Sequence, residues 1–499
     1  MTPHELVFDI TERFGPRPTT SASERHAADW FAQRCNQYGL NVEMQEFDTP
    51  RSPGYALGLL YILPTILIIT SRFTREMAWV TWLLIALLLG CIVLLALQLQ
   101  GRGILNAVLP KGPSQNVIAR CNASSTGDRQ RKVVFVSHLD TPLVSPLNTE
   151  STARLHQRLT GFSFWYLIAA LLVMIFLSFD FQWMEFVAFD KTIDSQLWLW
   201  MLFAVLSAVP AILGLDALLM PLLRRQSPGA NDSASGIAVL LSAIDAIALQ
   251  KGGQLESHDP PASQTTSFSE VEPFQQASDF EQPGMADWLE LDNSFDARKA
   301  GSAIGSWENF DQDKEATIAF ETTRAPLKEP QPAYVPQVPT GGQTGLEGFS
   351  SILDGKEVWF VATGARHSDA AGMRALLSTY DHELRDALIV NLESVGFGAL
   401  HWFSREAAPL TVRISSRVMS LSKRAARELE LRIAPYKGVA GVTDATPALF
   451  HHRKAGTITR LVGNGFPEAY RATDDYADAT DALVLEETVQ FILEFLAQA

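Results

Sequence analysis

Four long stretches of this chain consist almost entirely of apolar residues. They cover Tyr55 to Ser71, Ala78 to Leu99, Phe162 to Phe179 and Gln196 to Leu223. The second and fourth exceed the roughly 20 residues that a helix needs to cross a bilayer. The first and third hold 17 and 18 residues without a charge. Because none of the four has a polar face, buried helices of a soluble core fit them poorly, and the pattern predicts four membrane spans in two hairpins.

Outside these stretches, short apolar strands alternate with helices. Strands are predicted at Asn41–Phe47, Asn116–Asn122, Lys132–His138, Glu357–Thr363, Ala387–Ser394 and Thr411–Ser416. Helices are predicted at Ser235–Gln250, Ser368–Tyr380, Leu421–Ile433 and Leu485–Leu496, after an N-terminal helix that ends near Gly39. This alternation is typical of the α/β class and predicts a mostly parallel mixed sheet flanked by helices.

The order of these segments predicts how the chain is divided. An even number of spans returns the chain to its starting side, so one soluble domain is expected to form from residues 1–54, 100–161, 224–250 and 346–499. Residues 55–99 and 162–223 are the two transmembrane hairpins. Residues 251–345 are rich in Ser, Pro, Gln, Asp and Glu and have few aliphatic runs, which predicts a disordered acidic insertion.

Charge around the spans predicts the side on which the soluble domain lies. The flanks on that side are basic, and the loop between the third and fourth spans is acidic. The basic flanks carry Arg51, Arg102, Lys111, Arg154, Arg158, Arg224 and Arg225. By the positive-inside rule the soluble domain is cytoplasmic, although Arg72 and Arg75 on the other side oppose this. We expect an integral protein of the plasma membrane of a prokaryote.

Composition narrows the expected partners. The net charge is −15, and no segment forms a broad basic face, so we expect no nucleic acid partner. The cysteines Cys35, Cys91 and Cys121 form no CxxC pair, and we expect them to be free buried thiols.

Two polar clusters follow apolar segments directly. In VVFVSHLDTP, His138 and Asp140 stand at the carboxyl end of a strand, where α/β sheets bind their ligands. An imidazole there suits zinc, and a nearby carboxylate can orient the imidazole. In GANDSASGIAVLL, Asp232 opens a helix and can bridge metals. The alternatives are a loop histidine beside a solvated Asp140, and helix capping by Asp232 or Ser233.

Together these segments resemble the di-zinc exopeptidases that include leucyl aminopeptidases, glutamate-carboxypeptidase-like proteins and glutaminyl cyclases. The resemblance begins with FGPRPTTSASERHAADWFAQRCNQYGLNVEMQEF and continues through NVIARCN and KVVFVSHLDTP. GANDSASGIAVLL is similar to the bridging-aspartate motif, and VWFVATG and ALIVNLESVG resemble two later strands. TDATPALF and AYRATDDY resemble the closing loops. The similarity covers nearly all of the chain outside the spans and the acidic insertion.

The resemblance implies a zinc site. His138 would be a ligand, Asp140 its orienting partner, and Asp232 the bridge between metals. Glu393, in NLESVG, would take the place of an acidic ligand on the metal of His138.

The other half of the site departs from the family pattern. Where the family has two glutamates, a general base and a ligand, this chain has Arg366 and His367, and its last histidine ligand is replaced by Arg471. Arginine neither binds zinc nor acts as a base. The second metal would keep Asp232 and His367, and the two arginines are expected to pair with Asp232 in place of the missing cation. Asp369 is the substitute base we consider. Two further histidines could supply an imidazole, although a surface position is the simpler expectation for them; these are His451 and His452.

We therefore predict a membrane-anchored, zinc-dependent aminopeptidase-like enzyme with one zinc, two being the alternative. Its expected partners are a peptide substrate or a membrane-proximal protein, and the lipid bilayer. The alternative is a catalytically inactive homologue that acts as a membrane binding or scaffold protein. Transport is unsupported, since Asp216 is the only charge in the second and fourth spans. Eight residues separate the last span from Asp232, which places the site within roughly 30 Å of the membrane.

Overall fold

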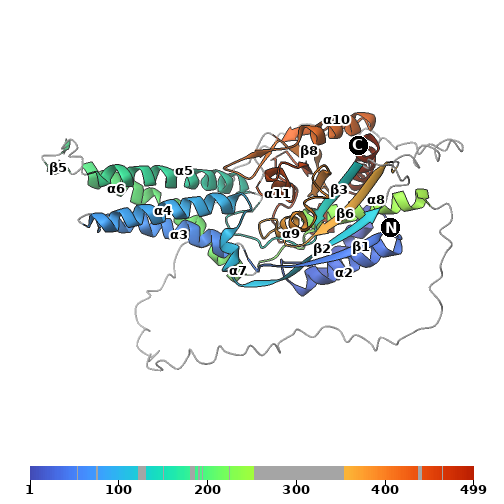
Figure 1. Ribbon diagram of the computed structural model, residues 1–499, viewed down its shortest axis with the longest axis horizontal. Coiled ribbons are helices and arrows are strands. Elements are labelled where there is room, and N and C mark those ends of the chain that lie inside the picture. Colours follow the sequence, from blue (N-terminus) through green and yellow to red (C-terminus); the bar gives the residue numbers. More distant parts are fainter. Residues whose placement is uncertain are drawn as a thin grey trace, which may run out of the picture. The chain divides into compact units, whose positions relative to one another are not determined.

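Eight strands form one sheet in the computed structural model of this chain, in the order β1-β2-β6-β3-β7-β12-β8-β11 (Figure 1). Their bounds are β1 (Asn41–Pro50), β2 (Lys111–Cys121), β3 (Arg131–His138), β6 (Lys356–Thr363), β7 (Leu388–Glu393), β8 (Ala399–Phe403), β11 (Ala434–Tyr436) and β12 (Lys454–Leu461). The central strands β6, β3, β7 and β12 are parallel to one another, whereas β1, β2 and β8 join through antiparallel pairs. The predicted mixed α/β sheet is confirmed.

The structure describes residues 1–52, 54–74, 77–121, 131–149, 151–179, 186–188, 191–193, 195–223, 225–251, 353, 355–436, 441–463 and 465–499. The predicted disordered insertion, 251–345, lies outside the described residues apart from residue 251.

Helices cover both faces of the sheet. One face packs against α1 (Pro3–Phe14), α2 (Ala22–Gln37), α8 (Ser235–Lys251), α10 (Ser416–Glu428) and α12 (Ala482–Gln498). The other packs against α9 (Ala371–Tyr380) and α11 (Ala445–Phe450). Within β3, Val133 and Phe135 face the first group of helices, and Val134 and Val136 face the second. All four are buried, because successive side chains of a strand point to opposite faces.

One predicted strand is wrong. Of Thr411–Ser416, only β10 (Val412–Arg413) is a strand, and it pairs with β9 (Arg405–Glu406) in a separate two-stranded sheet. The next helix, α10, already begins at Ser416. The sheet also contains β8, β11 and β12, which the sequence pattern did not predict.

Five apolar helices lie side by side in a bundle (Figure 1). They are α3 (Gly54–Thr70), α4 (Ala78–Leu99), α5 (Ala153–Ser178), α6 (Ser195–Leu206) and α7 (Ala208–Leu223). The predicted fourth span is thus divided at Ser207. Between α5 and α6, the strands β4 (Phe186–Ala188) and β5 (Lys191–Ile193) pair as antiparallel neighbours.

Four described helices are long and apolar enough to cross a membrane. They are Ala78–Leu99, Ala153–Ser178, Leu197–Leu223 and Ala230–Leu249. The first three match predicted spans and are only 28–39% buried in the protein, which leaves apolar surface for lipid. The last is 72% buried and contains most of α8, so it is a core helix of the α/β domain. The first predicted span is α3, whose 17 residues fall short of that length.

The short helix α3 is held by close contact with α7. A Cβ atom added at Gly58 would lie 2.9 Å from the main-chain oxygen of Gly214, and one added at Gly214 would lie 3.0 Å from that of Gly58. The two backbones therefore touch, as small residues allow where helices pack in a membrane. This contact joins the first hairpin to the second.

Both hairpins leave the sheet at the same end. Pro50 pairs with Lys111 at the end of the β1–β2 ladder where α3 and α4 are inserted. The antiparallel register of β2 on β6 places that end on the side toward which β6 and β3 run. The second hairpin follows the carboxyl end of β3. The bundle and the carboxyl ends of the central strands are therefore on one side of the α/β domain.

Candidate metal centre

The predicted site residues come from four segments that meet at this end of the sheet. His138 is the last residue of β3, and Glu393 is the last of β7. Arg366 and His367 lie in the loop after β6. Asp232 lies in η2 (Ala230–Ala234), a short π-helical turn that leads into α8. Parallel strands bring their carboxyl ends together, which explains why residues so far apart in sequence meet here.

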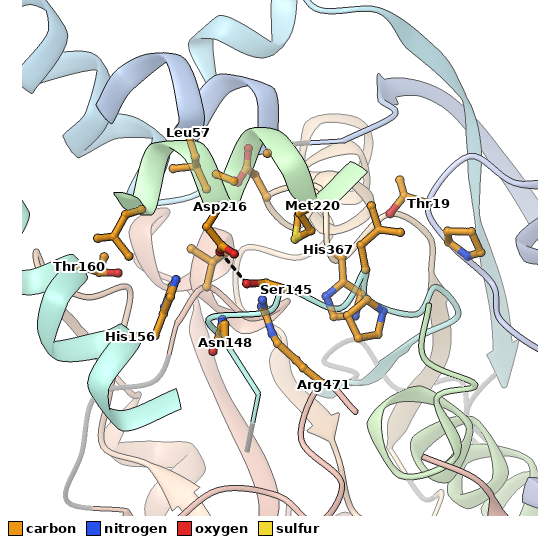
Figure 2. A pocket seen from close by; sticks show the side chains of 18 of the residues that line it. Thr19, Leu57, Ser145, Asn148, His156, Thr160, Asp216, Met220, His367 and Arg471 are labelled. Atoms are coloured by element: carbon orange, nitrogen blue, oxygen red, sulfur yellow. Dashed lines mark hydrogen bonds between the residues drawn. The ribbon is translucent and has the colours of Figure 1, made fainter. Parts of the chain in front are cut away.

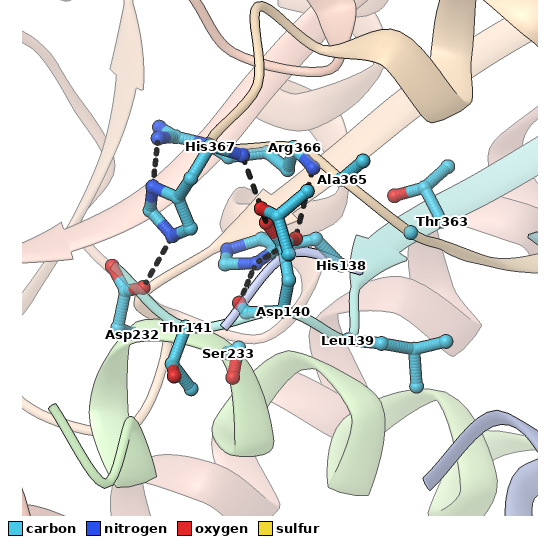
Figure 3. A network of polar contacts seen from close by, with 12 residues as sticks. His138, Leu139, Asp140, Thr141, Asp232, Ser233, Thr363, Ala365, Arg366 and His367 are labelled. Atoms are coloured by element: carbon cyan, nitrogen blue, oxygen red, sulfur yellow. Dashed lines mark hydrogen bonds and ion pairs between the residues drawn. The ribbon is translucent and has the colours of Figure 1, made fainter. Parts of the chain in front are cut away.

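Three of these residues form a compact group, consisting of His138, Asp232 and His367 (Figure 3). One ligand atom from each lies within 4.8 Å of the others. The two imidazole rings stand edge to face with centroids 5.2 Å apart. His367 Nε2 lies 3.0 Å from Asp232 Oδ2. Glu393 does not belong to this group.

The imidazole of His138 is held through one nitrogen only. Its Nδ1 lies 2.9 Å from the main-chain oxygen of Asp140 and 3.7 Å from the Asp140 carboxylate. Nδ1 therefore donates its hydrogen to the carbonyl, so that in the neutral ring the lone pair is on Nε2. Nε2 is buried and has no partner among the described residues. A buried nitrogen acceptor without a partner is costly unless something occupies the space before it.

The carboxylate of Asp140 supports the loop after β6. It accepts hydrogen bonds from the main-chain N–H groups of Arg366 (2.9 Å) and His367 (3.0 Å) and from the Thr19 hydroxyl (2.8 Å). We predicted that this carboxylate orients His138. In the structure the Asp140 carbonyl makes the shorter contact with Nδ1, the carboxylate lies 3.7 Å from the same nitrogen, and the carboxylate also fixes the loop that carries His367.

The electrostatics of the group favour a cation. Burial disfavours the charged form of His138, but the Asp140 hydrogen bond and the charge of Asp232 outweigh it and raise the pKa of His138 to about 9. Although burial opposes ionisation of Asp232, His367 and His138 hold the pKa of that carboxyl well below its usual range. Burial and the nearby Arg366 lower the pKa of His367. A space that stabilises a proton so strongly between carboxylates also attracts a metal ion.

Arg366 occupies the other half of the predicted site. Its guanidinium forms an ion pair with Glu393, and its Nη1 lies 3.1 Å from His367 Nδ1 (Figure 3). The expected pairing of Arg366 with Asp232 is wrong, because Asp232 contacts His367 instead. Glu393 also accepts a hydrogen bond from Asn391 at 3.2 Å. Glu393 thus faces a guanidinium where the resemblance implied a metal.

The remaining predicted residues lie apart from the group. Asp369 accepts hydrogen bonds from Gln98 and, at 2.9 Å, from Asn106, and burial raises its pKa. The guanidinium of Arg471 lies 5.6 Å from the centre of its neighbour Tyr470's ring and makes no ion pair with a described carboxylate. Two histidines are exposed at the end of α11, namely His451 and His452.

The sequence patterns did not single out several buried residues near the group, among them Asp444 and Arg17. Asp444 precedes α11 at the capping position but does not cap the helix, and it accepts a 2.6 Å hydrogen bond from Thr363. Burial raises its pKa to about 6, while His138 counteracts the rise. Arg17 donates to the carbonyls of Leu139 and Gly229, which ties the β3 loop to η2. The only signal for Asp444 was its place in TDATPALF, where helix capping is the ordinary expectation.

A cavity of about 230 Å³ connects this centre to the helical bundle (Figure 2). Arg366, His367 and Arg471 line it on the side of the α/β domain. The other walls come from the ends of α3, α4, α5 and α7 that adjoin that domain. His367 thus connects the candidate group to a cavity that reaches the bundle.

No family model matches the chain, and no curated protein matches it. Solved structures with a similar fold include a Zn-dependent exopeptidase from Parabacteroides distasonis (11% identity, TM-score 0.44, covering 99% of this chain and 96% of that one). Others are an aminopeptidase from Aneurinibacillus sp. strain AM-1 (10%, 0.44, 99% and 93%) and a glutaminyl cyclase from Porphyromonas gingivalis (11%, 0.42, 99% and 96%). These are the classes of protein that the sequence motifs resemble. At such identities and TM-scores, the function has to be inferred from the site itself.

Proposed function

We propose that this chain is a membrane-embedded, zinc-dependent peptidase that uses a single metal ion near the membrane surface. The observation that carries the proposal is the buried group of His138, Asp232 and His367, whose ligand atoms lie within 4.8 Å of one another. Two imidazoles and one carboxylate are a ligand set of catalytic zinc sites that keep a fourth position open.

The residues present fit one zinc ion better than two. His138 offers an Nε2 lone pair that no described residue uses. Asp232 carries the negative charge that offsets a divalent cation. The ion pair between Arg366 and Glu393 fills the remaining space with a fixed positive charge. A second metal would have to displace that guanidinium.

The chain's own residues support amide hydrolysis. Bound zinc supplies a Lewis acid that polarises a carbonyl group and activates water. Asp140 fixes the loop that carries His367. Asp444 is the described carboxyl that best fits a proton acceptor, because its Oδ1 has no partner among the described residues and burial raises its pKa to about 6, close to neutral pH. Glu393 is a poorer candidate, because its carboxylate is engaged in the ion pair with Arg366.

The apolar helices support the membrane location. The exposed side chains of α3, α4, α5 and α7 are largely apolar, as a lipid environment requires. The basic flanks favour a cytoplasmic α/β domain. The expected partners are a peptide and the bilayer, since the metal centre faces the bundle.

The test is the zinc content and peptide hydrolysis of the full chain purified in a neutral detergent. We expect close to one zinc per chain, and loss of both zinc and hydrolysis in His138→Ala. His451→Ala is the matched control, because His451 is an exposed histidine outside the group and both properties should survive. Two zinc ions per chain would contradict the single-ion proposal.

The second candidate is a non-catalytic binding protein, and the ion pair of Arg366 with Glu393 favours it. An internal cation can hold the carboxylates together without a metal. A chain that is folded yet carries no zinc, both as wild type and as His138→Ala, would support this candidate and overturn the first.

A further inference from the structure

The cavity beside the metal centre combines an apolar wall with unpaired positive charge. It has a volume of about 230 Å³ and is smaller than the roughly 300–1,000 Å³ of pockets that enclose a whole drug-sized ligand. It therefore fits a head group and the first part of a longer molecule. Its two ends show which kind of molecule that is.

The apolar wall extends into the helical bundle. Its side chains include Leu57 and Tyr61 from α3, and Leu213 and Met220 from α7 (Figure 2). Leu213 stands ten residues before the end of α7, which at 1.5 Å per residue is about 15 Å along the helix. The interfacial layer on each side of a bilayer is only about 5–8 Å thick. The cavity thus extends from the α/β domain to the depth of the acyl chains.

The polar wall holds two arginines that form no ion pair with its carboxyls. Neither Arg51 nor Arg471 makes an ion pair with a described residue. The two carboxyls in the wall contact neutral donors instead. Asp216 accepts a 2.6 Å hydrogen bond from Ser145, and Asp369 accepts from two amides. The guanidinium groups of the two arginines are therefore available to donate to an anion that enters the cavity.

We propose that the cavity binds an N-acyl amino acid or the N-acylated end of a peptide, taken from the membrane. The acyl chain lies against the apolar side chains that α3 and α7 contribute to the cavity, and the carboxylate is bound by Arg471. The amide between them lies beside His367, at the edge of the metal centre. A free fatty acid lacks the amide, and a phospholipid head group lacks it as well.

This assignment rests on the proposed function for its chemistry but not for binding. Hydrolysis would break the amide C–N bond. Water would supply its hydroxyl to the acyl carbon and a proton to the leaving nitrogen, which releases a fatty acid and the free amine. The reaction needs no co-reactant other than water.

The experiment measures equilibrium binding of radiolabelled N-lauroylglycine to the full chain in neutral detergent, with and without a zinc chelator. N-lauroylethanolamine keeps the chain and amide but has no charge, and N-acetylglycine keeps the head group but has no chain. We expect N-lauroylglycine to bind at least tenfold more tightly than either. Equal binding of the neutral compound would overturn the role of Arg471, and equal binding of N-acetylglycine would overturn that of the bundle.

Two pairs of variants locate the ligand. Arg471→Gln should weaken N-lauroylglycine about tenfold or more and leave N-lauroylethanolamine within twofold, since a hydrogen bond to a charged group is lost. Arg413→Gln, on the exposed strand β10, should change neither. Met220→Trp should weaken both ligands by filling the apolar end. Leu219→Trp, one residue earlier and exposed, should not. Unchanged binding in Arg471→Gln and Met220→Trp would refute the assignment.

The chelator separates this inference from the proposed function. Binding of N-lauroylglycine by a chain that holds no zinc would leave the cavity assignment standing and remove the peptidase. One zinc per chain without binding of N-lauroylglycine would do the reverse. If N-lauroylglycine binds no better than N-lauroylethanolamine and phosphatidic acid displaces it, the cavity is a phospholipid site. This result would overturn the assignment.

Discussion

Replacing Arg366 by glutamine should increase the affinity of the metal centre for zinc. A guanidinium has hydrogens to donate but no lone pair to accept, so His367 Nδ1, 3.1 Å from Nη1, must be the acceptor. The ring hydrogen is then on Nε2, which donates to Asp232 at 3.0 Å. Zinc needs the Nε2 lone pair. Arg366 therefore favours the His367 tautomer whose Nε2 carries the hydrogen, and zinc binding in the wild type has to displace that hydrogen.

Glutamine reverses this preference. Its amide oxygen can accept the Nδ1 hydrogen, which frees Nε2 toward Asp232 and His138. Its N–H groups can still donate to Glu393, which would otherwise be left as a buried, unpaired carboxylate at a cost of several kcal/mol. The substitution also removes a positive charge near the metal.

The electrostatic repulsion between the Arg366 guanidinium and a zinc ion sets the size of the expected change in zinc affinity. The imidazole ring and a zinc–nitrogen bond each add about 2 Å to the 3.1 Å contact, so the ion would lie about 7 Å from the guanidinium. At an effective dielectric constant of about 20, one and two positive charges at that distance repel by about 5 kcal/mol. Glu393 offsets part of this, and about 2–3 kcal/mol remains. At 1.36 kcal/mol per tenfold change, Arg366→Gln should bind zinc about 30- to 150-fold more tightly.

The assay is competition for zinc with a chromophoric chelator, on the full chain in detergent. Arg413→Gln is the control for the same change of residue type on the surface, and it should leave the zinc affinity within twofold. Thermal unfolding without metal checks that Arg366→Gln remains folded. A folded Arg366→Gln variant whose zinc affinity differs from wild type by less than threefold would refute the tautomer and charge argument together.

Three further predictions test the surrounding structure. Gly58→Leu should lower the midpoint of thermal unfolding by several degrees, because its new Cβ would lie 2.4 Å from the Leu218 side chain. Gly90→Leu is the control and should leave the midpoint unchanged, because the space around Gly90 is open. Equal midpoints for the two variants would show that α3 and α7 do not pack closely. Glu406→Gln should flatten the dependence of stability on pH. Burial raises the pKa of Glu406, so the folded state binds its proton more strongly and the free energy of unfolding falls as pH rises above about 4.3. Thermal unfolding from pH 4 to 8 measures this dependence of stability on pH. The same slope in Glu406→Gln as in the wild type would contradict the role of Glu406. Asp444→Asn should reduce peptide hydrolysis by about 10² or more at unchanged zinc content, and full activity would remove Asp444 as the proton acceptor.

The strand ends could be predicted from the sequence because apolar runs stop at polar residues there. His138 and Asp232 belong to short motifs in which the residue types themselves indicate chemistry. The strand β12 could not be found in this way. Gly456 interrupts its alternation, and the structure needs glycine there because a Cβ would lie 2.3 Å from Ile414 of a segment far away in sequence.

The ion-pair partners of charged residues could not be predicted from the sequence, for a related reason. Arg366 was identified as a replacement, yet its pairing depends on which carboxylate lies within reach once β6 and β7 are parallel neighbours of β3. Asp369 follows Arg366 by three residues, but the loop turns it toward Gln98 at the end of α4. Distances across a sheet follow from its strand order, which a single sequence does not contain.

The two arginines at the altered positions argue against simple decay of a metal site. Arg366 forms an ion pair with Glu393 and contacts His367, so its positive charge has a negative partner within the protein. Arg471 is half-buried at the cavity and has no described carboxylate partner. A site that had only lost its metal would need a cation near its carboxylates, which Arg366 alone provides. The second positive charge is then best explained by an anion that binds in the cavity.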